Sequence, residues 1–364
     1  MTPRLLAAAL VVGIAACGGS QRLDDRSTAP EIPFSAIETV ADLDYPPGNI
    51  AVSGRGRVFF TLHPDGAPPS QVNELIDGKP IPYPSPIYPD YQSVLALRID
   101  SQNRLWALDY ARYGRGQPRL TAFDLATDSE VHRYDFPADV AGFLSMVNDF
   151  QVSPDGNTIY IAEASPIRQT PAIIVYDVPS RTSRRVLDSD PSLLPQGYVI
   201  QAPGRDIIVL GVYTLHIGID TIALDRQGEW LYYGPVNGGR LYRVNTGDLR
   251  DAALAPAELA RRVVDFGPKP ISDGATTDDA GNVYLTDPEH SAVLATNADR
   301  VLRTVVKDPR LRWPDGLSFG PDGWLYLTCS ALQHVLFVST ATMREHAPYQ
   351  IVRFHPGPTA APGQ

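Results

Sequence analysis

Hydrophobic and polar residues alternate in short runs along most of this chain, and the runs come in pairs. Each pair begins with an alternating apolar stretch, turns through Asp, Gly or Asn, and ends in a second stretch with an aromatic residue. Apolar alternation with a period of two predicts strands, and turn residues between two such runs predict a hairpin. The pairs are NIAVSGRGRVFFTL from Asn49, ALRIDSQNRLWALD from Ala96, DFQVSPDGNTIYIAE from Asp149, TIALDRQGEWLYYG from Thr221, GATTDDAGNVYLTD from Gly274 and GLSFGPDGWLYLTC from Gly316.

The pairs recur roughly every 50 residues, a period typical of the four-stranded blades of a β-propeller. Composition agrees, because 34 Pro and 29 Gly in 364 residues leave little room for long helices. We predict an all-β, six-bladed β-propeller over residues 36–356, in which the two chain ends complete one blade. One short helix is expected in a blade connector at residues 256–264. The aromatic residues after the turns are expected to pack between blades: Phe59, Trp106, Tyr160, Tyr232, Tyr284 and Tyr326.

The first residues, MTPRLLAAALVVGIAAC, combine one positive charge, an apolar run and small residues before Cys17. This order is typical of a secretory signal, and the stretch IAAC resembles a bacterial lipobox, whose cysteine is acylated. The apolar run is shorter than the about 20 residues that a membrane span needs. We expect a signal peptide at residues 1–16, a flexible tether at 17–35 and a C-terminal tail at 357–364. The protein is then an exported lipoprotein whose only membrane contact is its lipid anchor. In a Gram-negative cell it lies in the periplasm or at the outer membrane.

Charge and cysteine content narrow the function classes. The chain has 41 acidic and 31 basic residues, a formal net charge of −10, and no basic run of five or more residues, so nucleic acid is not an expected partner. Cys17 and Cys329 provide no disulfide framework, and Cys329 is expected to be a small buried residue. Zinc-binding spacings, phosphate-binding glycine loops and a nucleophile elbow are missing from the sequence.

Polar residues precede several of the predicted inner strands. Inner strands of a propeller begin at one face and line a central channel, so side chains at their starts converge. The residue before each pair is Gly48, Leu95, Asn148, Asp220, Asp273 or Asp315. Carboxylates gathered at one mouth repel one another and require a counter-charge. Ca²⁺ or another divalent cation, held by Asn148, Asp220, Asp273 and Asp315, would supply it. The alternative is that these Asp residues serve turns and backbone caps.

Hairpin geometry adds candidates for catalysis. Counting outward from the turns, Asp287 lies opposite Asp273, and Glu163 lies opposite Asp149. His290 follows Asp287 by three residues, so these two are the candidate catalytic residues, with His290 as a general base. The alternative is a solvent-exposed loop histidine.

Two stretches resemble a known family. DFGPKPISDGATTDDAGNVYLTDPEHSAVL at 265–294 and DPRLRWPDGLSFGPDGWLYLT at 308–328 are similar to bacterial members of the major royal jelly protein/yellow family, some of them called L-dopachrome tautomerase-related. The resemblance extends from about Asn49 to Ser330. It implies a six-bladed propeller similar to gluconolactonases.

In gluconolactonase-like propellers, as the resemblance implies, Glu, Asn and Asp at inner-strand starts hold a metal. The Asp-Gly dipeptides at Asp273 and Asp315 match that site. The first pair departs from it, because Gly48-Asn49 stands where a lactonase has Glu.

Three functions stay open. The first is an exported protein of the yellow/royal-jelly type that binds a small organic ligand, aromatic or amine-bearing, at the channel mouth. The second is a divalent-metal-dependent hydrolase or isomerase, lactonase-like or dopachrome tautomerase-like, whose cation polarises a carbonyl. The third is a protein-interaction scaffold that uses an elaborated loop at 181–215. Whether the chain is an enzyme is not decided, because propellers host many functions.

The lipid anchor is testable in cells. Cys17→Ser removes the acylated sulfur, so we expect this variant to leave the membrane fraction or to keep its signal peptide. Fractionation and mass measurement check this, and membrane association identical to that of the wild type would contradict the lipoprotein interpretation.

Overall fold

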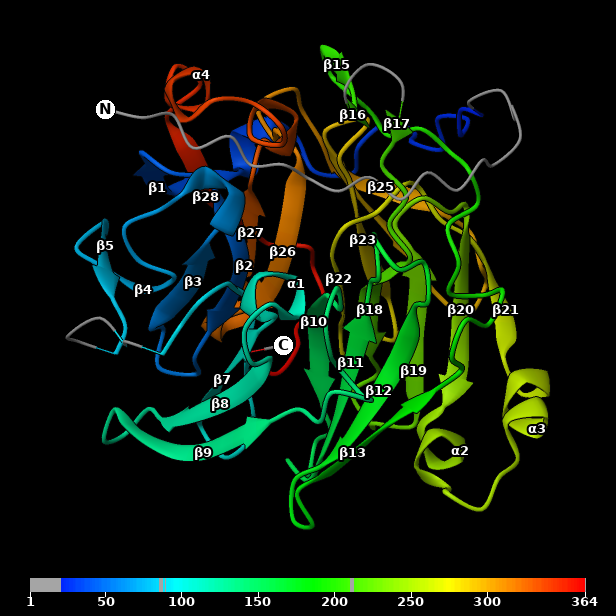
Figure 1. Ribbon diagram of the computed structural model, residues 1–364. Helices are drawn as coiled ribbons and strands as arrows, with labels where there is room; N and C mark the ends of the chain where they lie inside the picture. Colours follow the sequence, from blue (N-terminus) through cyan, green and yellow to red (C-terminus); the bar gives the residue numbers. More distant parts are fainter. Residues whose placement is uncertain (1–20, 85–87, 89, 210–212, 364) are drawn as a thin grey trace, which may run out of the picture.

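The computed structural model describes residues 21–84, 88, 90–209 and 213–363, so the predicted acylation site Cys17 lies outside the described residues. Six four-stranded sheets surround a central axis, which confirms the predicted six-bladed β-propeller (Figure 1). The inner strands follow one another around the axis in chain order, and the last packs against the first. No helix of the described residues has the length and apolar character needed to cross a membrane.

The strands occupy equivalent places in each blade. The innermost are β2 (Pro47–Val52), β6 (Val94–Ile99), β10 (Val147–Val152), β18 (Ile219–Leu224), β22 (Ala275–Thr277) and β26 (Pro314–Phe319). The second strands are β3 (Val58–Leu62), β7 (Arg104–Asp109), β11 (Thr158–Glu163), β19 (Trp230–Pro235), β23 (Val283–Asp287) and β27 (Leu325–Cys329). The third are β4 (Val72–Ile76), β8 (Arg119–Asp124), β12 (Ala172–Asp177), β20 (Arg240–Asn245), β24 (Ala292–Thr296) and β28 (Tyr349–Phe354). The outermost are β5 (Lys79–Pro82), β9 (Ser129–Asp135), β13 (Thr182–Val186), β21 (Val264–Pro268), β25 (Arg303–Lys307) and β1 (Glu38–Leu43).

Short elements fill the connections. The helices are α1 (Ala111–Gly114), α2 (Thr246–Arg250), α3 (Pro256–Arg261) and α4 (Thr340–Arg344), with 3-10 turns η1 (Phe34–Ala36), η2 (Pro64–Gly66), η3 (Pro321–Gly323) and η4 (Leu332–His334). Helix α3 confirms the predicted connector helix and ends three residues earlier than expected. Residues 181–215 were expected to form one elaborated loop. This expectation is only partly correct, because the segment begins with the outer strand β13. Two hairpins follow, β14 (Gln201–Ala202) with β15 (Arg205–Asp206), and β16 (Ile208–Val209) with β17 (Tyr213–Thr214).

Both chain ends build the sixth blade, as predicted. Strand β1 from the N-terminal side pairs antiparallel with β28 from the C-terminal side, with Leu43 opposite Tyr349. Strand β28 then pairs with β27, with Leu325 opposite Phe354. This pairing closes the ring and leaves the core between the first and last blades covered.

Each predicted inter-blade aromatic is buried, the most exposed being Tyr232 at 8%. They belong to apolar clusters between neighbouring sheets, where Trp106 packs with residues of β10 and β11. Cys329 is also buried and unpaired, as expected, and burial raises the pKa of its thiol to about 12.

Segments outside the blades also pack on them. Residues 21–35 are the described part of the predicted tether, and part of this segment lies along β25, where the backbone N–H of Ile32 donates to the carbonyl of Val305 at 2.9 Å. The C-terminal tail crosses the end of the channel at which the inner strands finish. There Gly363 bonds to the backbones of Phe319 in blade six and Ile99 in blade two. The chain end lies near the centre in Figure 1. The channel is thus covered at this end.

Removal of the closing strand tests the ring. A chain that stops after Leu332 lacks β28, so β1 and β27 lose their partner and the core between blades one and six is exposed. We expect no cooperative thermal unfolding in this truncated protein. A chain that stops after Pro356 keeps all six blades and serves as the control. A soluble Leu332 truncation that melts near the wild-type temperature would contradict the account.

Candidate functional site

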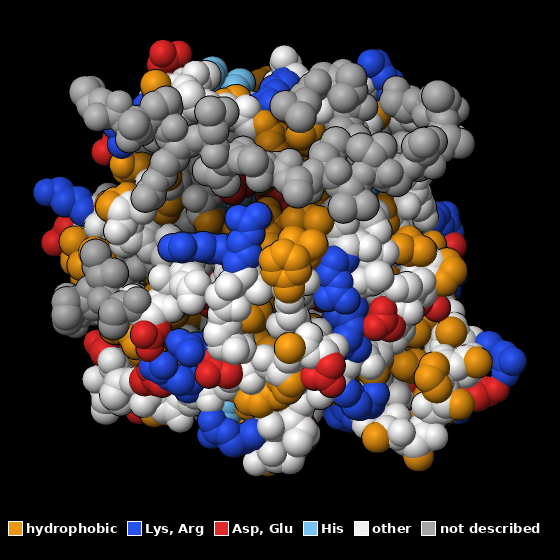
Figure 2. Space-filling view, viewed as in Figure 1, with side chains coloured by type: hydrophobic (Ala, Val, Ile, Leu, Met, Phe, Trp, Pro, Cys, Tyr) orange, Lys and Arg blue, Asp and Glu red, His pale blue; other side chains and the backbone are white. Residues whose placement is uncertain are grey.

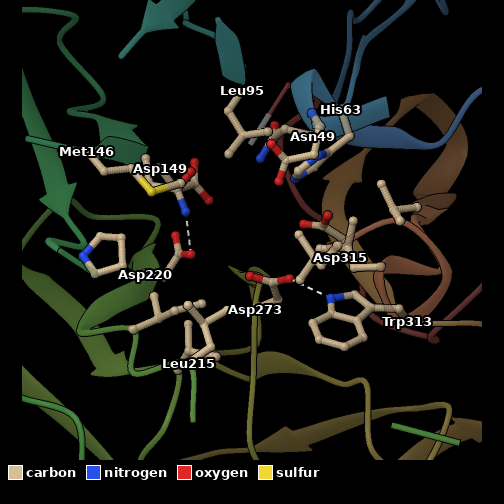
Figure 3. Close-up of a pocket in the computed structure, with 18 of the residues that line it drawn as sticks. Asn49, His63, Leu95, Met146, Asp149, Leu215, Asp220, Asp273, Trp313 and Asp315 are labelled. Atoms are coloured by element: carbon tan, nitrogen blue, oxygen red, sulfur yellow. Dashed lines mark hydrogen bonds between the residues drawn. The ribbon is translucent and has the colours of Figure 1, made fainter. Parts of the chain in front are cut away.

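A cavity of about 400 Å³ opens at the channel mouth, the end where the inner strands begin. All four predicted rim residues, Asn148, Asp220, Asp273 and Asp315, line it. The carboxylates of Asp220, Asp273 and Asp315 point into the same space in Figure 3. The prediction that inner-strand starts converge is therefore confirmed for this set.

An irregularity at the start of most inner strands places these side chains. An extra residue on one strand of a pair breaks the regular alternation and redirects a side chain. In blade five, β22 begins two residues after Asp273. In the other blades the register between the first two strands shifts between Pro47 and Ile50, Val94 and Ala96, Val147 and Phe150, Ile219 and Thr221, and Pro314 and Leu317. The candidate residues therefore lie at or just before the start of regular pairing.

Close backbone approach explains the Asp-Gly dipeptides. A Cβ atom on Gly274 would lie 2.0 Å from the carbonyl oxygen of Asp315, and one on Gly316 would lie 2.8 Å from the Cα of Asn49. Both distances are shorter than any real contact, so glycine is required where neighbouring inner strands meet at the axis. These dipeptides therefore form strand contacts and do not serve the tight turns that the sequence left open.

Threonines of the second strands fix the same segments. The hydroxyl of Thr286 accepts from the N–H of Gly274 at 2.9 Å, and that of Thr328 accepts from the N–H of Gly316 at 2.8 Å. Thr328 also donates to the carbonyl of Gly48 in the next blade at 2.5 Å. Because backbone groups freed from the ladder need partners, these bonds hold the irregular strand starts in place.

Each rim carboxylate accepts a side-chain hydrogen bond from a neutral donor. The Asn148 amide donates to Asp220, and the Trp313 indole N–H donates to Asp273 Oδ2 at 2.7 Å (Figure 3). The Ser330 hydroxyl donates to Asp315 Oδ2 at 2.6 Å. These neutral donors orient the carboxyl groups and bring no positive charge to them.

Sequence reasoning missed a buried ion pair made by the cavity residue Asp149. Arg98 Nη2 lies 2.8 Å from Asp149 Oδ2, and Arg98 Nη1 donates to Asn49 Oδ1 at 2.7 Å. Asn49 occupies the blade where a lactonase-like site is expected to have Glu. The guanidinium neutralises Asp149 and occupies the amide oxygen of Asn49. The sequence does contain a signal for this ion pair. Arg98 lies inside the pair ALRIDSQNRLWALD, where its charge interrupts an otherwise apolar inner strand and so requires a buried partner.

Burial and crowding raise the pKa values of the rim carboxyls. Desolvation raises the pKa of Asp220 well above its usual range, and the neighbouring Asp273, Asp149 and Asp315 raise it further. The pKa of Asp315 is likewise raised well above its usual value, by burial and then by Asp273. The pKa of Asp273 is raised too, mainly by burial. Without a bound cation, the cavity therefore favours protonated carboxyl groups.

The histidine that reaches this cavity is His63. It is buried in the cavity wall and its Nδ1 accepts from the N–H of Asp65 at 3.3 Å. Burial lowers the pKa of His63, which keeps the ring neutral. Sequence reasoning preferred His290 because it follows Asp287 by three residues. That spacing does not show which way the loop turns, so it could not show which histidine reaches the cavity.

Asp287 and His290 contact each other outside the cavity. His290 Nδ1 lies 2.9 Å from Asp287 Oδ2, and His290 Nε2 lies 3.6 Å from Asp25 Oδ1 in the N-terminal segment. The hydrogen bond to Asp287 raises the pKa of His290. The pair thus anchors the N-terminal segment to blade five, and neither residue lines the cavity. Its predicted catalytic role stays untested.

The strand register in two blades tests the expected pairings of Asp273 with Asp287 and of Asp149 with Glu163. Blade five keeps a regular register, with Ala275 opposite Leu285, so Asp287 does end the strand next to Asp273. However, its side chain points away from the channel, toward His290. Glu163 pairs with Val147 and not with Asp149, which corrects the expected pairing, because the irregular strand start shifts the register.

Apolar side chains form the rest of the cavity wall. Leu215 and Ile217 come from the connection before β18, and Trp313 precedes β26. The connection after β27 adds Leu332, Val335, Leu336, Phe337 and Val338. An acidic floor under an apolar wall is therefore the defining feature of this site (Figure 3).

Fold and site together define a six-bladed propeller with an acidic cavity at one mouth. A sequence model of the family "Major royal jelly protein" matches residues 92–345, and the chain belongs to this family. The resemblance inferred from the sequence is thus confirmed.

Among related proteins, major royal jelly protein 1 of Apis mellifera is 29% identical over 220 residues, which cover 53% of this chain and 49% of that protein. Major royal jelly protein 6 of the same species is 28% identical over 187 residues, which cover 45% and 39% of the two chains. The chain therefore spans about half or less of the length of these curated relatives.

Solved structures support the fold. A luciferin-regenerating enzyme superposes with a TM-score of 0.57 at 11% identity and covers 90% of this chain and 97% of its own. A putative gluconolactonase has a TM-score of 0.57 at 14% identity, with 89% and 92% covered. Regucalcin of Agrobacterium tumefaciens, described as a calcium-binding protein, has 0.57 at 16% identity, with 92% and 99% covered. At these identities the similarity shows the fold alone.

The raised carboxyl pKa values predict how stability depends on pH. A carboxyl group whose pKa is higher in the folded protein stabilises it below the unfolded pKa, and this stability is lost as pH rises through the folded pKa. Each unit of the shift costs about 1.4 kcal/mol above that pH. Asp315→Asn cannot ionise, so in chelated, ligand-free buffer its melting temperature should increasingly exceed that of the wild type from pH 4.5 to 7.5.

The exposed Asp322→Asn variant, at the other end of blade six, is the control and should follow the wild type. A constant difference between Asp315→Asn and the wild type at all pH values would contradict the raised pKa.

Proposed function

We propose that this protein binds a small organic cation, an amine with an apolar or aromatic body, in the cavity at the channel mouth. The observation that carries the proposal is the combination of Asp220, Asp273 and Asp315 at the floor with apolar side chains above them. An ammonium group would replace the protons that the crowded carboxyls otherwise hold. Its apolar body would contact Trp313 and Leu336 in the wall, as small-molecule sites usually combine few polar groups with an apolar lining.

The chemistry of the wall distinguishes this ligand from others. An anionic ligand would be repelled as soon as one floor carboxyl ionises, and Arg98 is already paired with Asp149. A neutral ligand would leave the floor carboxyls protonated, so its affinity would not rise with pH. A cation attached to an apolar group satisfies both parts of the cavity.

A divalent metal is the second candidate, because Asn148, Asp220, Asp273 and Asp315 offer oxygen ligands of the kind that Ca²⁺ prefers. When bound, such an ion would act as a Lewis acid that polarises a carbonyl group. The donor set fits incompletely, since Arg98 occupies the oxygen of Asn49 and pairs with Asp149. That fixed positive charge beside the floor favours a monovalent organic cation over a second, doubly charged ion.

The protein is also proposed to be an exported lipoprotein anchored through Cys17, on the sequence alone. The scaffold alternative receives less support, because the connection that contains Leu215 and Ile217 forms a wall of the cavity.

Calorimetric titration tests the ligand class. Phenethylammonium should bind, and phenylacetate, which has a similar body and the opposite charge, should not. Affinity should rise with pH between 5 and 7.5, since the raised carboxyl pKa values make the cation displace protons at the lower pH. Asp273→Asn and Asp315→Asn should each weaken binding at least tenfold, whereas Asp322→Asn should not.

The same titration with CaCl₂ after chelator treatment separates the candidates. Stoichiometric calcium binding that Asp273→Asn abolishes, without binding of phenethylammonium, would establish the metal site and contradict the organic-cation proposal. Equal binding of phenylacetate and phenethylammonium would contradict both.

A further inference from the structure

Large apolar side chains are exposed around the mouth of the cavity. Phe143 is 66% exposed, Ile167 52% and Phe337 57%. Phe337 lines the cavity itself, and Ile167 follows the cavity residue Pro166. Phe143 belongs to the connection into β10, whose Leu144 N–H donates to the carbonyl of Tyr113, another cavity residue, at 2.8 Å. These three side chains, the mouth patch, therefore surround the cavity entrance.

The mouth patch is flanked by basic residues. Arg112 and Arg115 are exposed on the connection that contains α1, and Arg168 is exposed next to Ile167. In the view of Figure 2, hydrophobic side chains near the centre have Lys and Arg side chains on either side. Asp65 is an exposed acidic residue at the same mouth. The chain has a net charge of −10, yet three arginines gather around these apolar groups.

The chain enters the described fold at the same face. Gln21 bridges to Tyr198, and the Asn237 amide donates to the carbonyls of Tyr198 at 2.8 Å and Leu215 at 2.9 Å. Leu215 lines the cavity. Gln21 lies four positions after the predicted acylation site, Cys17, a distance along the chain of at most about 14 Å. An acyl chain on Cys17 would therefore hold this face near the bilayer.

We propose that the mouth face docks on an anionic phospholipid surface, with Phe143, Ile167 and Phe337 in the interface and Arg112, Arg115 and Arg168 against the headgroups. Basic residues near such a surface strengthen binding to it, and a lipid anchor is reinforced by a second contact of this kind. The cavity then opens toward the headgroup layer, and its ligand arrives from there. The proposal rests on the predicted anchor and is independent of which ligand the cavity binds.

Lipid quenching measures the orientation directly. The acylated full-length protein is reconstituted in vesicles of phosphatidylethanolamine and phosphatidylglycerol at 3:1, with brominated acyl chains. An environment-sensitive fluorophore is placed on Phe143→Cys or on Val301→Cys. Val301 is equally exposed at 66% and lies in the turn between β24 and β25, at the end of the propeller away from the mouth. Cys329 is buried and does not compete for the label.

We expect at least threefold stronger quenching at position 143 than at position 301, and Ile167→Cys should repeat the result of Phe143→Cys. R112E/R115E/R168E, and vesicles of phosphatidylcholine alone, should bring position 143 to the level of position 301. Equal quenching at positions 143 and 301 would overturn the proposal. So would quenching that survives the charge reversals, a mature protein without an acyl group, or a mouth patch protected by a protein partner in the absence of lipid.

Discussion

The close approach of six inner strands around one axis is the constraint on which the rest of the structure depends. It requires glycine at Gly274 and Gly316, where any side chain would collide with the backbone of the next blade. It also interrupts regular pairing at the strand starts, and threonines of the second strands, such as Thr286 and Thr328, bind the backbone groups so released. The carboxylates next to these glycines thereby meet at one mouth.

That meeting is unfavourable for an isolated protein. Three carboxyl groups share a small volume and accept side-chain hydrogen bonds from Asn148, Trp313 and Ser330, and the buried guanidinium of Arg98 already pairs with the cavity residue Asp149. Such a cluster persists in a fold when the ring that imposes it is stable without it. Closure by β1 and β28 from the two chain ends provides that independent stability. The stability of the closed ring thus keeps the crowded carboxyl groups together, and a bound cation would reduce their unfavourable interaction.

Much of this arrangement could be predicted from the sequence, because the repeat is regular. Hydrophobic alternation and turn residues predict the six blades, and the position before each repeat predicts Asn148, Asp220, Asp273 and Asp315 as a group. The rest depended on local geometry. The shifted register that pairs Glu163 with Val147 is invisible to counting from a turn. The contact of Arg98 with Asn49 joins two blades, and the choice of His63 over His290 depends on the direction of each loop.

The central claim is that a cation replaces protons on the rim carboxyls. Calorimetry of phenethylammonium binding at pH 6, in buffers with different ionisation enthalpies, counts the protons released into solution. The account predicts a net release on binding, and a clear reduction of this release in Asp220→Asn. Binding with no proton release at pH 6 would contradict it, because the carboxyls would then already be ionised and the cation would displace no protons.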